Sequence, residues 1–150
     1  MSKTLKLAVV VVSVLITTVS AAYAHVTIQP KESKAGASET YTMRVPTEKF
    51  VPTVRVEVEF PANLNVSSFE SKAEWKIEEK KDTSGKVIGA VLVGSIPTGK
   101  SEMFRFTAKN PAEAGTLSVK VIQIYEDGTM SEWTGAAGSR TPAPSIELKK

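Results

Sequence analysis

The one histidine of this 150-residue chain, His25, stands directly after an Ala22-Tyr23-Ala24 sequence. A-x-A is the pattern at which signal peptides are cut, and cleavage after Ala24 would give His25 a free α-amine. That amine and the imidazole Nδ1 belong to one residue and can chelate a single ion in a six-membered ring. The amine has an ordinary pKa of about 7.7–8.0, so a metal ion can displace its proton near neutral pH. Cleavage would therefore create half of a metal site.

Divalent copper is the ion that such a half-site favours. Among the common divalent first-row metals, copper(II) binds nitrogen ligands most tightly, and it prefers tetragonal arrangements of nitrogen and oxygen. A carboxylate is the natural third ligand because it offsets the charge of the ion. Spacing alone does not choose among the 16 aspartate and glutamate residues. It also leaves open that His25 is an ordinary, solvated first residue.

Residues 1–24 have the three parts of a secretory signal peptide: a start with Lys3 and Lys6, an apolar run over residues 7–16, and the A-x-A site. The alternative is an uncleaved membrane anchor, but the apolar run is shorter than the roughly 20 residues that span a bilayer. We predict a signal peptide over 1–24 and a mature domain over 25–150. The mature protein is expected in the periplasm or secreted, without stable membrane insertion.

The composition restricts the function further. The chain has no cysteine, so it has neither disulfides nor a thiolate for soft metals or nucleophilic catalysis. Its formal charge is +3, and removal of the two leader lysines lowers it to +1. No stripe of Lys and Arg remains in the mature part, so a nucleic-acid partner is not expected.

Short alternating segments indicate that the elements holding this site are strands. In 53–60, Val54, Val56, Val58 and Phe60 alternate with charged residues, as in a strand with one buried face. Further strand-like segments are 26–30, 39–45, 75–80, 86–94, 103–108, 117–125 and 145–149. Turn residues at 82–85, 97–99, 110–111 and 126–129 separate them, and 135–144 reads as a loop. No window has a sustained helical stripe, so we predict an all-β antiparallel sandwich, immunoglobulin- or cupredoxin-like.

Four motifs together resemble the YcnI-like copper-binding domain family over nearly all of the mature chain. They are the A-H-V start, a T-x-x-V-P-T-E-K segment, an F-x-A-K-N-P segment and a D-G-x-x-x-E-W-T-G segment. The resemblance implies an immunoglobulin/cupredoxin-like sandwich that binds copper(II) through a mono-histidine brace. In that arrangement the first histidine supplies amine and ring nitrogen, a glutamate supplies oxygen, and a tryptophan lies beside the ion.

Carried over by position, the resemblance makes His25 and Glu70 the metal ligands and places Trp133 beside the metal. Glu74 is a rival ligand, because the family tends to have Pro-Gly before the tryptophan at position 75, where this chain has Ala73-Glu74. Glu132 is a second rival. In an extended segment, however, Glu132 and Trp133 point to opposite faces, which favours Glu70.

The remaining sulfur and aromatic residues are expected to be structural. Trp75 and Met43 read as core residues. The three methionines after the initiator lack Met-x-x-Met spacing, so we expect weak retention of copper(I), which prefers thioether and thiolate ligands.

The resemblance implies a role in copper homeostasis, with transfer to a membrane copper transporter or an oxidase assembly factor. The alternative is a metal-free structural or adhesive immunoglobulin-like module. An oxidative enzyme like the polysaccharide oxygenases would need a second histidine, which this chain lacks, so no enzymatic activity is expected.

Overall fold

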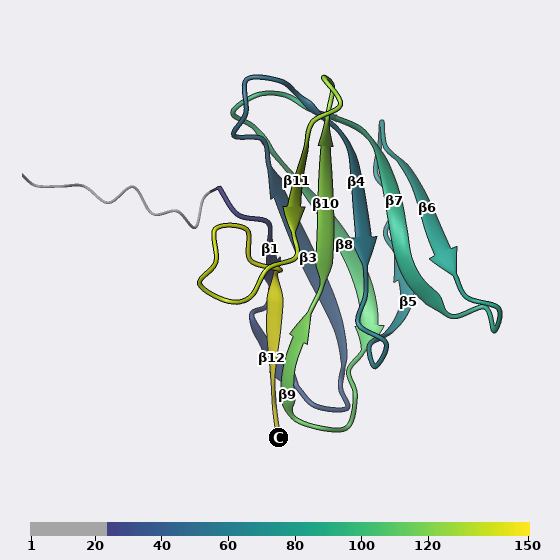
Figure 1. Ribbon diagram of the computed structural model, residues 1–150. Coiled ribbons are helices and arrows are strands. Elements are labelled where there is room, and N and C mark those ends of the chain that lie inside the picture. The colour runs from purple at the N-terminus through teal and green to yellow at the C-terminus, as the bar shows by residue number, and fades with distance from the viewer. Residues whose placement is uncertain (1–23) are drawn as a thin grey trace, which may run out of the picture.

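The computed structural model describes residues 24–150, which form a curled β-sandwich without helices (Figure 1). Nine strands make one sheet with the path β1-β3-β8-β5-β7-β4-β10-β11, and β6 pairs with β7 outside this path. A second, three-stranded sheet, β2-β12-β9, closes one end. The predicted all-β antiparallel sandwich is confirmed. Residues 24–150 contain no helix that could cross a membrane. The predicted signal peptide lies outside the described residues, except for Ala24.

The strands in chain order are β1 (Thr27–Gln29), β2 (Glu32–Lys34), β3 (Ser38–Pro46), β4 (Thr53–Glu59), β5 (Asn65–Phe69), β6 (Lys76–Lys81), β7 (Val87–Ile96), β8 (Ser101–Lys109), β9 (Gly115–Ser118), β10 (Lys120–Tyr125), β11 (Met130–Trp133) and β12 (Ser145–Lys149).

The large sheet folds over on itself where β5 meets β7. These two strands share a single register pair, Val66 with Val87, and β5 carries a bulge against β8. Bulges sharpen the local twist and bend a strand. As a result β11, β10, β4, β7 and β6 lie in front of β3 and β8 in Figure 1, with the core between the two layers. The curl also turns the two end strands of the path, β1 and β11, toward each other.

The core follows the predicted alternation in most strands. Tyr41, Met43 and Val45 of β3 are fully buried and belong to one hydrophobic core with Val56 and Val58 of β4. Complete burial of a side chain of this size contributes about 1.5–3 kcal/mol to folding.

The prediction for residue 54 was wrong. A register irregularity between Thr53 and Arg55 turns Thr53 inward, with 0% of its surface exposed, and leaves Val54 only half-buried. The bulge therefore places a threonine hydroxyl, in place of an apolar side chain, in the core.

Other elements also differ from the sequence-based expectation, among them β2, which lies outside the predicted strand segments. The predicted strand over 117–125 is two strands, because the chain crosses from the small sheet to the large sheet at Val119. The amide of Val119 leaves both ladders and donates to the Pro144 carbonyl over 2.9 Å. Strand β5 was not predicted, since its "NVSSF" sequence has one buried apolar position between polar neighbours.

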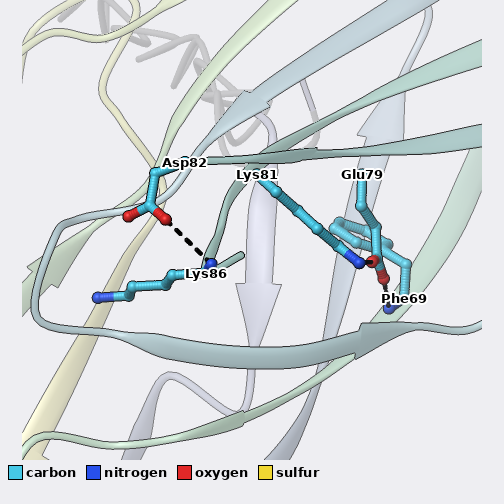
Figure 2. Close-up of polar contacts among 5 residues, drawn as sticks. All are labelled: Phe69, Glu79, Lys81, Asp82 and Lys86. Atoms are coloured by element: carbon cyan, nitrogen blue, oxygen red, sulfur yellow. Dashed lines mark hydrogen bonds and ion pairs between the residues drawn. The ribbon is translucent and has the colours of Figure 1, made fainter. Parts of the chain in front are cut away.

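The predicted tight turns at 82–85 and 126–129 are confirmed as β-hairpins. In the first, the Asp82 carboxylate accepts the Lys86 amide over 3.0 Å (Figure 2). The Glu79 carboxylate of the same hairpin accepts the Phe69 amide over 3.1 Å and lies 3.8 Å from Lys81 Nζ, which ties β6 to the end of β5 (Figure 2). Such charged groups also discourage pairing of the β6 edge with another chain.

Candidate metal centre

His25 lies two residues before β1, and its backbone is fixed by the strand that follows. Val26 and Ile28 are each 2% exposed, so the start of the chain is packed into the core. Strand β1 pairs antiparallel with β3, with Thr27 opposite Arg44 and Gln29 opposite Thr42. The imidazole itself is half-buried and borders a shallow pocket whose other wall includes Ala137 and Pro142 of the 135–144 loop. The described part of the chain therefore does not leave His25 as a frayed end.

Trp133, the last residue of β11, meets His25 across the sandwich. Its ring centroid is 5.6 Å from that of the imidazole, with the planes tilted by 57°. Trp133 is 7% exposed, whereas its neighbour Glu132 is exposed on the opposite face, as the alternation predicts. The structure thus brings together two of the three residues that the resemblance placed at the metal.

The indole nitrogen of Trp133 is already committed to a hydrogen bond. Its Nε1–H donates to Gln123 Oε1 over 3.1 Å, inside the sandwich. An indole N–H is a donor only, so this nitrogen is no metal ligand. What Trp133 presents toward His25 is its aromatic ring, at 5.6 Å between centroids.

Glu70, the third predicted residue, lies elsewhere on the sheet. Its amide donates to the Arg105 carbonyl over 2.8 Å, and its carboxylate lies 3.6 Å from Arg105 Nη1 on an exposed surface. Strands β8 and β3 separate it from β1, which at the usual spacing of sheets amounts to about 14 Å. The register also places it level with Gln29, four residues or about 13 Å along from His25. The structure does not bring Glu70 and His25 together.

The two rival carboxylates are not beside the imidazole either. Glu74 is exposed in the turn between β5 and β6, with a positive φ of 66°, and the next residue packs its indole on Phe104 with centroids 4.8 Å apart. Glu132 faces away from Trp133.

Glu48, which the sequence-based reasoning did not single out, follows the end of β3, where the register of β1 with β3, extended by two residues, places His25 level with Pro46. Glu48 lies two residues after Pro46, whose carbonyl accepts Gln123 Nε2 over 2.7 Å. Burial raises the pKa of the Tyr125 phenol, the Ser131 hydrogen bond lowers it, and the negative charge of Glu48 raises it further. Tyr125 and Ser131 are hydrogen-bonded over 3.0 Å, and Ser131 shares a face of β11 with Trp133. The signal that could have found Glu48 is its place in the T-x-x-V-P-T-E-K segment.

Within residues 24–150, no three imidazole or carboxylate side chains are grouped as a ready metal cluster. A brace needs no such group, because one histidine supplies two of its nitrogens. The donors that can meet here are the His25 imidazole, an α-amine on the same residue if the chain is cut before it, and one carboxylate. Borderline-soft nitrogen with hard oxygen suits copper(II) better than copper(I).

The fold and this site define an immunoglobulin-like β-sandwich with a histidine–tryptophan pair at the start of its first strand. The chain belongs to the DUF1775 family, described as a domain of unknown function, which it matches over residues 25–148. The match thus begins at His25.

A relative of known name supports the same assignment. The chain is 40% identical over 123 residues to the copper-binding protein CutI of Bacillus subtilis (strain 168). The alignment covers 81% of this chain but 60% of CutI, so the chain spans about three-fifths of the length of this relative. The resemblance to the YcnI-like family is therefore confirmed.

Solved structures bear out the fold. An uncharacterized protein from Nocardia farcinica with an immunoglobulin-like fold superposes with a TM-score of 0.73 at 24% identity, over 84% of this chain and 99% of that one. A cohesin module from a Clostridium perfringens family 33 glycoside hydrolase superposes with a TM-score of 0.55 at 16% identity, over 83% and 94%. At these identities the likeness concerns the architecture alone.

Proposed function

We propose that this protein binds copper(II) outside the cytoplasm and holds or delivers it, through a mono-histidine brace at His25. The observation that carries the proposal is the contact of His25 with Trp133, 5.6 Å between ring centroids, in a chain 40% identical to a copper-binding protein. Copper is cargo here, and the protein's activity is binding without catalysis.

The nitrogen donors come from His25 alone. Cleavage after Ala24 frees the α-amine, which together with Nδ1 forms a chelate that needs little ordering, because Val26 already anchors the following backbone. The start of the family match at His25 supports this boundary and, with it, a signal peptide over 1–24.

An oxygen donor completes the brace, and both Glu70 and Glu48 are candidates for this role. The placement of the two residues favours Glu48, which follows the Pro46 carbonyl held by Gln123. Glu70 would have to leave Arg105 and reach across β8 and β3. Glu48 is exposed and has no such commitment to an arginine among the ion pairs of the described residues.

Trp133 is proposed to cover one face of the bound ion. An apolar wall beside a metal controls access of water and so affects both affinity and redox behaviour. The open side of the site would receive or release copper, with a membrane copper transporter or an oxidase assembly factor as the proposed partner.

A titration of copper(II) into the chain that begins at His25 tests the proposal. We expect binding of one ion per chain, with nitrogen hyperfine structure in the electron paramagnetic resonance spectrum. Two controls are matched to it: His25→Ala removes the imidazole, and a chain that retains Ala24 keeps the imidazole but moves the free amine by one residue. His25→Ala should lose the binding, and the chain that retains Ala24 should lose the spectrum of the brace, because its amine can join the imidazole only with the intervening peptide nitrogen. An unchanged affinity and spectrum in either control would contradict the brace. If the chain that begins at His25 binds no copper(II), the alternative of a metal-free structural module is favoured.

A further inference from the structure

A buried glutamine, Gln123, connects the two sides of the proposed site. Its side chain is 0% exposed between the layers of the sandwich. Its Nε2 donates to the Pro46 carbonyl over 2.7 Å and to Thr53 Oγ1 over 2.6 Å, while its Oε1 accepts from Trp133 Nε1 over 3.1 Å. One amide thus holds the indole on one side and the segment leading to Glu48 on the other.

The chemistry of the partners allows only one orientation of this amide. A carbonyl oxygen only accepts and an indole N–H only donates, so Nε2 must face Pro46 and Oε1 must face Trp133. A rotation of the amide by 180° would set two acceptors against each other on one side and two donors on the other.

The network beyond Gln123 is also complete. Thr47 donates to the Ile96 carbonyl over 3.2 Å, so the 2.7 Å bond between Thr47 and Thr53 has Thr53 as its donor. Within residues 24–150, no buried side-chain nitrogen or oxygen lacks a hydrogen-bond partner. The chain of bonds joins β3, β4, β7, β10 and β11, and the indole cannot swing away without breaking it.

The hydrophobic pattern does not account for a glutamine at this position. Its neighbours Ile122 and Ile124 are half-buried on the outer face of β10, while the amide takes the inward position. Burial of an amide is costly unless its hydrogen bonds are made, and an apolar residue of similar size would fill the space without that cost. What glutamine adds is a directional hydrogen bond, which fixes the position of the Trp133 ring.

We propose that Gln123 is the positioning residue of the copper site, holding the indole of Trp133 against His25 and fixing the Pro46 end of the segment that carries Glu48. The copper part of this inference rests on the proposed function. The positioning of Trp133 stands on the hydrogen bonds alone and can be tested without metal.

The metal-free test follows the indole N–H signal of Trp133 in ¹⁵N-labelled chain beginning at His25, which contains every described strand. The chain has two tryptophans, and Trp133→Phe assigns the two signals. In Gln123→Met, which keeps the length but removes the acceptor, we expect an upfield shift and a weaker nuclear Overhauser effect between the Trp133 and His25 rings. In Gln123→Glu, which keeps an acceptor, the signal should stay closer to that of the parent protein.

Asn110→Leu provides the matched control. Asn110 is also a buried amide, 3% exposed, and it bonds Tyr41, Ser33 and the Lys34 carbonyl, none of which contacts Trp133 in the hydrogen bonds described. It should lower stability without moving the Trp133 signal. An unmoved Trp133 signal in Gln123→Met, or an equal shift in Asn110→Leu, would overturn the positioning role. Should Gln123→Met not fold, Gln123→Ala, which also removes the acceptor of the Trp133 N–H, replaces it, and an unmoved Trp133 signal in that variant would overturn the positioning role in the same way.

The second readout is copper affinity. Loss of groups that orient a metal site typically costs 10–100-fold in affinity, and we expect a loss of about this size in Gln123→Met, with a smaller loss in Gln123→Glu. Equal copper affinity in Gln123→Met and the parent protein would overturn the role of Gln123 in the metal site. If the parent protein binds no copper while Gln123→Met still shifts the indole signal, the proposed function fails and the positioning of Trp133 stands.

Discussion

The ring centroids of His25 and Trp133 lie 5.6 Å apart, although His25 directly precedes the first strand of one sheet path and Trp133 ends the last. The curl at β5 and β7 brings these ends together, and the ring contact is where they meet. A ligand bound at His25 and covered by Trp133 would therefore join the first strand of the sheet to the last. Binding of a metal at His25, as proposed, would thus be coupled to the integrity of the curled sheet.

Copper(II) is accordingly expected to stabilise the chain that begins at His25. A ligand that binds only the folded state adds about 2.7 kcal/mol at a free concentration of one hundred times its Kd. The midpoint of thermal unfolding should rise with copper, and hydrogen exchange should slow at the amides of Thr27–Gln29 and Met130–Trp133. His25→Ala, which removes the imidazole, serves as the control and should show neither effect. Protection spread evenly over all strands would contradict a link between these two ends.

The carboxylate of the site can be identified by two neutral, isosteric variants. Glu48→Gln should weaken copper(II) binding by about tenfold or more, equivalent to about 1.4 kcal/mol, because it removes the negative charge and the better oxygen donor. Glu70→Gln should leave the affinity unchanged, since Glu70 is engaged with Arg105 on β8. Isothermal titration of copper(II) into both variants measures the two affinities. A loss in Glu70→Gln with none in Glu48→Gln would identify Glu70 as the ligand.

The sequence predicts most of this fold because alternation is clear wherever apolar residues fill one face. Strand β3, with Tyr41, Met43 and Val45 inward, and β12, predicted over the same residues 145–149, are confirmed. The pattern fails where polar residues occupy the core. Thr53 and Gln123 are fully buried, and only their hydrogen bonds, which come from distant segments, explain why.

The residues of the candidate site also differ in how far the sequence predicts them. His25 and Trp133 could be named from the sequence because a single histidine after a cleavage pattern and a D-G-x-x-x-E-W-T-G motif are local signals. The neighbourhood of Glu48 could not, since it depends on the Pro46 carbonyl meeting an amide 77 residues away in the sequence. Sequence distance contains no information about which strands a curl brings together.

Reduction of the metal is expected to release it. The donors proposed here are nitrogen and oxygen, whereas copper(I) prefers sulfur. Met43 is fully buried, Met103 lies on β8 two strands from β1, and Met130 begins β11 on the face opposite Trp133. Addition of ascorbate with a copper(I) chelator should transfer the metal rapidly, while the same chelator without reductant should not. Slow transfer that becomes fast in Met130→Leu would show that a thioether takes part.

The β10–β11 hairpin should lose stability in acid through Asp127. The pKa of this carboxyl is lowered chiefly by the hydrogen bond from the Thr129 hydroxyl at 2.6 Å, and then by the Thr129 amide at 3.0 Å. A depressed pKa means that the contribution is present above the ordinary value of 3.8 and is lost as the pH falls through the lower folded value. The difference in free energy of unfolding between the parent protein and Asp127→Ala should be constant near neutral pH and shrink below about pH 4. A difference that grows in acid would contradict this assignment.

Gly94 of β7 and Trp75 are expected to be coupled in stability. A Cβ at position 94 would lie 2.4 Å from Cδ2 of the Trp75 indole, with two further ring atoms within 2.7 Å. These atoms belong to the middle of a rigid ring, so Gly94→Ala must displace the whole indole from its edge contact with Phe104, 4.8 Å between centroids. Overpacking of this kind costs about 1–3 kcal/mol.

A double-mutant cycle measures the coupling, with denaturant unfolding as the readout. In a Trp75→Leu background the same Gly94→Ala change should cost much less, because the smaller side chain can give way. Ser95→Ala, at an exposed position next along β7, is the control and should be close to neutral. Equal costs of Gly94→Ala with and without Trp75 would mean that strand propensity, and not the indole, selects glycine at this position.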